Sequence, residues 1–103
     1  MTTLTMNNGL TPQQQDTLTH IINANPKVED ILLFGSRATG NYRTNSDIDI
    51  ALVGEQLTSG DIANILNQIE QSTIPYKVDI LITHKIKNKA LLEHIQQYGE
   101  KWL

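Results

Sequence analysis

The residues most able to do chemistry in this sequence are two aspartates, Asp47 and Asp49, in a segment of alternating character. The alternation of polar and apolar residues from Ser46 to Val53 predicts a strand, on which these two aspartates lie on one face, with Cα atoms roughly 6–7 Å apart. Two carboxylates so close repel each other unless a cation lies between them, and oxygen ligands suit Mg²⁺ or Mn²⁺. An Asp-x-Asp pair by itself also fits a strand face that is simply solvated.

A third carboxylate occupies a similar position further along the chain. The segment from Tyr76 to Ile82 predicts another strand, with its large apolar residues on one face and Asp79 on the other. If the two strands pair with matched faces, Asp47, Asp49 and Asp79 converge. Such a group could hold one or two metal ions, as phosphoryl-transfer chemistry with two metals requires.

A glycine and a serine stand at the end of a predicted buried strand, Ile31 to Phe34. Gly35 lets the backbone approach a ligand closely, and the N–H groups after it and the Ser36 hydroxyl can receive phosphate oxygens. Arg37 and Arg43 lie in the same loop and could contact a triphosphate. Gly-Ser alone also fits an ordinary turn, and Arg43 alone fits a surface residue. The combination of Gly-Ser, ten residues and Asp-x-Asp is the specific signal.

Two segments together resemble a known signature: Phe-Gly-Ser-Arg-Ala-Thr-Gly at 34–40, and Ser-Asp-Ile-Asp-Ile at 46–50. The resemblance is to the minimal nucleotidyltransferases (MNT domains) of the DNA polymerase β-like nucleotidyltransferase superfamily. The roles that it implies are triphosphate binding by Gly35 and Ser36, and metal binding by Asp47, Asp49 and Asp79. It also implies that Asp79 helps to activate the attacking hydroxyl. Many relatives carry a second basic residue where this chain has Thr39, so one contact to substrate or partner differs here.

The resemblance implies transfer of AMP from ATP to a hydroxyl acceptor, with Mg²⁺ or Mn²⁺ as cofactor and release of pyrophosphate. It further implies an MntA-type antitoxin that pairs with a HEPN-family toxin and adds AMP to a tyrosine of that partner. Two alternatives stay open. The chain could neutralise its partner by contact alone, or it could adenylylate a small molecule, although 103 residues leave no room for a substrate-binding second domain.

The elements that must position these residues follow from the pattern of apolar residues. Thr11-Pro12 begins a first helix, and Gln14 completes a capping box with Thr11. A second helix begins after Thr58 or Ser59, and a last helix begins at about 87. The order is helix, strand, Gly-rich turn, strand, helix, strand, helix. We expect an α/β (α+β) fold with a small central mixed sheet flanked by helices.

Size and composition set further limits. The 103 residues predict a single domain over 1–103, in which 1–10 form a loose lead-in. A net charge of -3 does not indicate a basic nucleic-acid-binding face, and the absence of cysteine excludes disulfides and thiolate metal sites. No apolar run approaches the roughly 20 residues of a membrane helix, and the polar first ten residues lack the apolar core of a signal peptide. We therefore expect a cytoplasmic protein. These features do not define its oligomeric state.

Two further features have a plain interpretation and a functional one. The histidines show no metal-ligand spacing and are interpreted as surface or core residues: His20, His84 and His94. The last helix presents Leu91, Leu92, Ile95 and Tyr98 on one stripe, and Trp102 follows it. Trp102 either folds back on the core or anchors an interface.

Overall fold

The structure is a computed structural model that describes residues 8–103. In chain order its elements are α1 (Pro12–Asn23), β1 (Asp30–Phe34), α2 (Ser36–Thr39), β2 (Ile48–Val53), α3 (Ser59–Glu70), β3 (Val78–Ile82), the 3-10 helix η1 (Thr83–Lys85), α4 (Lys89–Tyr98) and β4 (Glu100–Lys101). The predicted order is confirmed, and a short terminal strand is added to it.

The strands form one mixed sheet in the order β3-β2-β1-β4. β1 runs antiparallel to β2 and β4, whereas β2 and β3 run parallel and are joined through α3. The sheet, with helices on both sides of it, confirms the predicted fold class.

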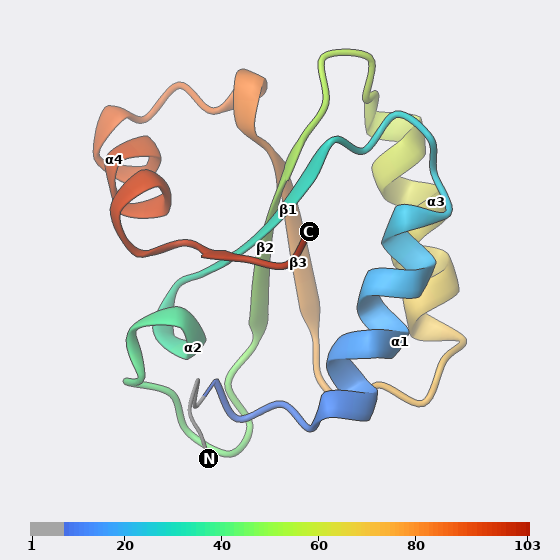
Figure 1. Cartoon of the computed structure of the whole chain (residues 1–103), viewed down its shortest axis with the longest axis vertical. Coiled ribbons are helices and arrows are strands. Elements are labelled where there is room, and N and C mark those ends of the chain that lie inside the picture. Colours follow the sequence, from blue (N-terminus) through green and yellow to red (C-terminus); the bar gives the residue numbers. More distant parts are fainter. Residues whose placement is uncertain (1–7) are drawn as a thin grey trace.

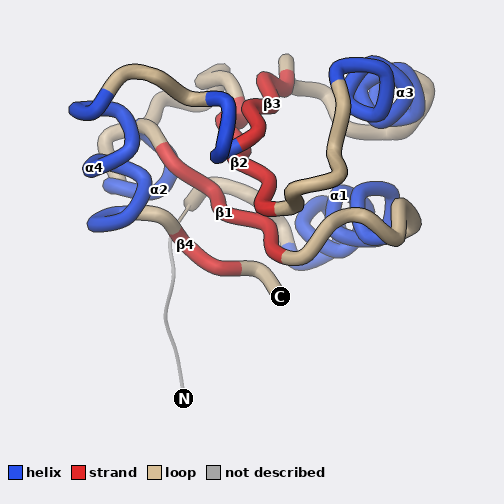
Figure 2. The backbone as a smooth tube through the Cα atoms, turned by 90° about the horizontal axis from the view of Figure 1, so that it is seen from above, coloured by secondary structure: helices blue, strands red, loops and turns tan. Residues whose placement is uncertain are grey.

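The helices divide between the two faces of the sheet (Figures 1 and 2). α1 and α3 lie side by side on one face, and α4 packs on the other, near α2. The main core lies under α1 and α3, where Leu18, Ile22, Ile31, Leu33, Ile48, Ile50 and Leu52 are all fully buried. A smaller core beneath α4 contains Phe34, Ala51 and Ile95. Burial of Ala51 shows that the face bearing Asp49 is not simply solvated, because α4 covers part of it.

Side-chain caps set the starts of the long helices. The Thr11 hydroxyl accepts from the backbone N–H of Gln14, and the Gln14 side chain accepts from the backbone N–H of Thr11, so the predicted capping box is present. Thr58 and Asp61 form the same arrangement at the start of α3. Each cap satisfies N–H groups that a helix leaves without internal partners, a contribution of about 1 kcal/mol.

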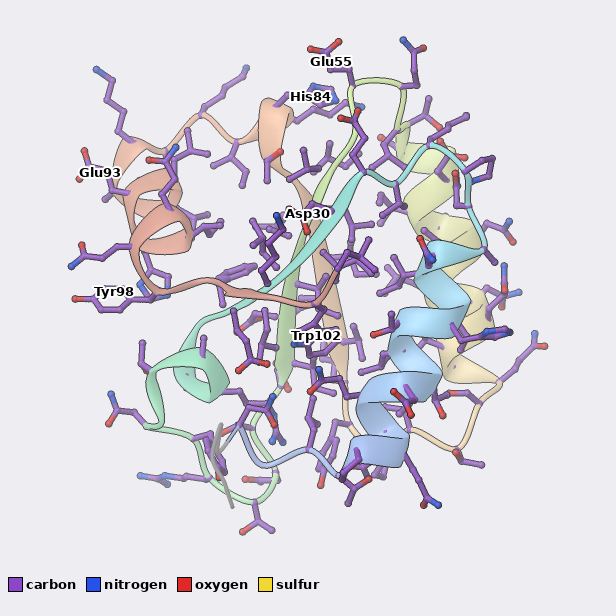
Figure 3. The ribbon with its side chains drawn as sticks, viewed as in Figure 1. Asp30, Glu55, His84, Glu93, Tyr98 and Trp102 are labelled. Carbon is purple, nitrogen blue, oxygen red and sulfur yellow. The ribbon has the colours of Figure 1, made fainter. Side chains whose placement is uncertain are left out.

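The C-terminal end was not predicted as a strand. Lys101 pairs with Leu32, and the backbone N–H of Trp102 donates to the carbonyl of Ile31. The Trp102 ring packs against the main core, and its indole N–H donates to Glu100 at 2.6 Å. Of the two interpretations of Trp102, the structure therefore supports the one in which Trp102 folds back on the core. Tyr98 instead is 49% exposed and points outward (Figure 3).

The first described residues differ from the predicted loose lead-in. Asn8 is 4% exposed, and its side-chain amide donates to Glu100 at 2.9 Å. Leu10 packs against the main core, so 8–10 belong to the folded body. The rest of the predicted lead-in, 1–7, lies outside the described residues. Across 8–103, no helix has the length and apolar character needed to cross a membrane.

Candidate active site

The predicted carboxylates meet at one end of the sheet because of the pairing of β2 with β3. In the parallel register Asp49 lies directly beside Asp79, so both side chains leave the same face of the sheet. Asp47 lies just before β2, two residues from Asp49, and is exposed. The side chain of Asp79 is 48% exposed, with Lys77 at 4.0 Å from it. The face is therefore open to a ligand from solvent.

Burial and the neighbouring carboxylates perturb Asp49. Partial burial, then repulsion from Asp79, then repulsion from Asp47, raises the pKa of its carboxyl above the ordinary value, while Lys77 opposes this less strongly. A negative charge at Asp49 is thus costly in the metal-free protein. A cation between the carboxylates would remove that cost.

The carboxylates do not form a complete ion cage. Within residues 8–103, no three side chains of metal-binding type lie close enough together to hold an ion as they stand. The tight group is the pair Asp49 and Asp79, with Asp47 next to it on exposed chain. The donor set nevertheless fits a hard divalent cation, because it offers only carboxylate oxygens and because proximity already disfavours the ionised form of Asp49.

Gly35 lies directly against Asp49 of this pair. The residue before it, Phe34, pairs with Asp49 in the β1–β2 register. Gly35 itself has φ 76° and ψ -154°. Residues that carry a side chain rarely adopt that backbone conformation, and a Cβ atom at this position would collide with the Asp49 carboxylate. Glycine is therefore required here both for the turn and for its close approach to the acidic group.

Ser36 begins α2 immediately after the glycine and is partly exposed. A helix leaves its first N–H groups without internal partners, so the backbone N–H groups of Ser36 and Arg37 take no part in the hydrogen bonds of α2. The contact between this turn and phosphate oxygens stays a prediction.

Arg37 does not lie where the predicted contact to a triphosphate requires. The side chain is only 2% exposed, and its guanidinium donates to the carbonyl of Ser46 at 2.8 and 3.2 Å and to that of Asn8 at 3.0 Å. It also stacks on Tyr76, 4.4 Å from the ring centre. Arg37 therefore fastens the chain just ahead of Asp47, and we correct its assignment from nucleotide binding to support of the site.

Arg43 is the exposed cation of the same loop. Its backbone N–H donates to the Ser46 hydroxyl at 2.7 Å, and the backbone N–H of Ser46 donates back to its carbonyl at 3.1 Å. The turn that carries Arg43 is thus held next to Asp47, and its side chain is exposed to solvent.

His94 was not predicted as part of the site, yet it contacts the glycine turn. The backbone N–H of Gly35 donates to Nε2 of His94 at 3.1 Å. Phe34 and Tyr98 flank the imidazole, with ring centres 6.3 and 5.3 Å away. No motif signals this contact, because it joins residues 59 positions apart whose approach depends on how α4 packs.

A cleft of about 470 Å³ opens beside Asp79, between the end of α3 and the start of β3, and Tyr76 and Lys77 line it too. A larger hollow of about 790 Å³ lies along α1, between Asp16 and Ala24. The cleft is lined mainly by α3 and by the segment that leads into β3, on the side of the main core, and Asp79 is the one predicted site residue in its wall, whereas the hollow on α1 has none.

The chain is similar to known proteins in sequence and in fold. The model of the family described as "Polymerase beta, Nucleotidyltransferase" matches residues 16–101. Two proteins of Methanocaldococcus jannaschii, each named as a protein adenylyltransferase, are similar. One is 33% identical over 86 residues, covering 74% of this chain and 70% of its own length. The other is 32% identical over 78 residues, covering 71% and 77%.

Solved structures show the same fold. A chain from a toxin–antitoxin structure with AMP-PNP is 24% identical and matches with a TM-score of 0.72, over 85% of this chain and 72% of that one. A chain from the complex of a tri-AMPylated Shewanella oneidensis HEPN toxin with an MNT antitoxin is 21% identical and matches with a TM-score of 0.65, over 85% and 68%.

Proposed function

The chain belongs to the polymerase β nucleotidyltransferase family and is a nucleotidyltransferase, and from that premise we propose that it transfers AMP from ATP to a hydroxyl group of a protein. The observation that carries this proposal is the pairing that sets Asp49 beside Asp79, with Gly35 against Asp49. A phosphate-binding turn and a carboxylate pair in contact are the two parts that this reaction needs.

The proposal assigns the cation to the three carboxylates. Asp47, Asp49 and Asp79 would hold Mg²⁺, or Mn²⁺ in its place. When bound, the ion supplies positive charge that orients the triphosphate and stabilises charge developing on its oxygens. The raised pKa of Asp49 supports this, because a group whose negative charge is already costly gains most from a cation.

The chain's own groups then have separate roles. The turn of Gly35 and Ser36 receives phosphate oxygens, and the exposed Arg43 lies within the same loop to meet the outer phosphates. The acceptor oxygen attacks the α-phosphorus and forms the new ester bond, while the bond from that phosphorus to the oxygen bridging the β-phosphate breaks. Pyrophosphate leaves, and the proton of the acceptor hydroxyl passes to Asp79, whose side chain is half exposed.

We propose a HEPN-family toxin as the acceptor and the cytoplasm as the place of reaction. The names of the two relatives support a protein acceptor, and the toxin–antitoxin structures support a HEPN partner. The form of the site is consistent with this, since Asp47 is exposed and the side chain of Asp79 is 48% exposed, so a small acceptor would be poorly enclosed there. A protein brings its own surface to such a site.

The test uses a purified HEPN-family toxin as the acceptor. We expect Mg²⁺ and ATP labelled at the α-phosphate to label that protein, whereas ATP labelled at the γ-phosphate should not, because the γ-phosphate leaves with pyrophosphate. Asp49→Asn should abolish labelling while the variant stays folded. Peptide mass mapping would then identify the modified hydroxyl.

Three results would contradict the proposal in different ways. Inhibition of the toxin without any label would favour neutralisation by contact. Label in small metabolites alone would favour the small-molecule alternative. Transfer at the wild-type rate by Asp49→Asn would remove the assignment of the carboxylates.

A further inference from the structure

The Gly35 turn is held from two sides by groups distant in sequence. On one side lies the Asp49 carboxylate, so close that a Cβ atom on residue 35 would overlap it. On the other side Nε2 of His94 accepts the backbone N–H of Gly35 at 3.1 Å. The peptide group between Phe34 and Gly35 therefore has its N–H directed at α4 and already paired there.

His94 is itself held in place. Phe34 meets the imidazole edge to face, with ring planes at 77°, and Tyr98 lies one helical turn further along α4 with its ring centre 5.3 Å away. Ile95, the next residue, is 3% exposed and packs with Phe34 and Ala51 beneath the helix. The imidazole thus belongs to a packed region, and the position of α4 decides where its acceptor nitrogen stands.

The contact also defines which tautomer is present. A backbone N–H can donate to Nε2 only if that nitrogen carries a lone pair, so the neutral ring has its proton on Nδ1. The carbonyl of Gly35 accepts from the backbone N–H groups of Ala38 and Thr39, so α2 holds the peptide group between Gly35 and Ser36. The bond to His94 restrains the peptide group before it, and the N–H and hydroxyl of Ser36 remain as donors.

We propose that His94 is a positioning residue for the nucleotide: it fixes the Gly35 peptide so that Ser36 presents its N–H and hydroxyl to the phosphates of ATP. This rests on the proposed function only in taking the turn as the phosphate site. A turn that is already ordered loses less conformational entropy when the ligand binds, so binding is tighter than with a mobile turn. The phosphate contact predicted for the N–H groups after Gly35 is thereby assigned to Ser36.

Two substitutions separate the acceptor nitrogen from the bulk of the ring. His94→Leu keeps an apolar side chain but has no acceptor. His94→Gln places an amide oxygen near the position of Nε2 and keeps the bond. His84→Leu is the matched control, since His84 is an exposed histidine on η1 (Figure 3).

The first readout is free of activity. In two-dimensional proton–nitrogen NMR spectra, the Gly35 amide resonance of His94→Leu should move, and exchange of that amide proton with solvent should become faster. In His94→Gln the chemical shift and the exchange rate should return to those of wild type. The second readout is calorimetric titration with ATP and Mg²⁺. We expect about tenfold weaker binding in His94→Leu, the factor that corresponds to loss of about 1.4 kcal/mol, and binding within about twofold of wild type in His94→Gln and His84→Leu.

The kinetic split gives a third readout. A contact that holds the phosphates equally in ground and transition states should raise KM for ATP about tenfold and leave kcat within about twofold. The proposal is overturned by an unchanged Gly35 resonance, by equal ATP binding in wild type and His94→Leu, or by a fall in kcat at constant KM. If wild type binds ATP as described but labels no protein, the proposed function fails and the role of His94 stands; if wild type binds no ATP, both fail.

Discussion

Arg37 offers the sharpest test of how the site is supported, because the sequence alone pointed to a different role for it. We predict that Arg37→Met destabilises the fold strongly and affects ATP binding only through that loss. The buried guanidinium donates three hydrogen bonds to two backbone carbonyls, those of Ser46 and Asn8, and methionine preserves most of the stem but none of the donors.

The size of the effect follows from the carbonyls that lose their partner. Leaving a buried acceptor unsatisfied costs about 1–3 kcal/mol, so two acceptors cost about 2–6 kcal/mol. Removal of the buried charge offsets part of this. A net loss of about 3 kcal/mol in the free energy of unfolding corresponds to a fall in Tm of roughly 12–24 °C for a domain of this size.

The assay is urea denaturation followed by circular dichroism, with Arg43→Met as the matched control. The exposed Arg43 should change the free energy of unfolding by less than about 0.5 kcal/mol, yet its loss should weaken binding of ATP. Binding to Arg37→Met is measured at low temperature, where the variant is still folded. The reasoning is refuted if Arg37→Met unfolds like wild type while its affinity for ATP falls about tenfold, because the guanidinium would then contact the nucleotide.

Three further predictions concern stability. The pKa of Asp49 is raised in the folded state, so its contribution to stability is present below the ordinary aspartate pKa and is lost as pH rises through the raised value. Metal-free Asp49→Asn should therefore resist urea better than wild type at pH 7, and this advantage should vanish toward pH 3. Asp61 behaves in the opposite sense, since hydrogen bonds from the backbone of Thr58 and from Lys27 lower its pKa to about 2. Wild type should lose stability relative to Asp61→Asn as pH falls from about 4 to 2. Parallel curves of unfolding free energy against pH for the two proteins would disprove this. Trp102→Ala should cost about 2 kcal/mol, less than the loss of a fully buried ring, and an unchanged urea midpoint would mean that the C-terminal end does not support the core.

Local pattern predicted most of the secondary structure because its causes lie within a few residues. The capping box of Thr11 and Gln14, and the alternation that buries Ile48 and Ile50, are each legible in a short window. The start of α4 differs by only two residues from the prediction. β4 was missed because two residues are too few to show a period, and only pairing with β1 makes Glu100 and Lys101 a strand.

The sequence by itself determined the family and the kinds of group in the site, because the spacing of Gly35, Asp47 and Asp49 depends on one turn and one strand. Only the tertiary structure decided which groups meet. Parallel pairing placed Asp79 beside Asp49, burial turned Arg37 toward the carbonyl of Ser46, and the packing of α4 brought His94 to the glycine N–H. The physical reason is the same in each case. The type of a residue and its place in the local sequence pattern determine what it is able to bind. What it does bind depends on its neighbour across the fold, and the packing of distant elements fixes that neighbour.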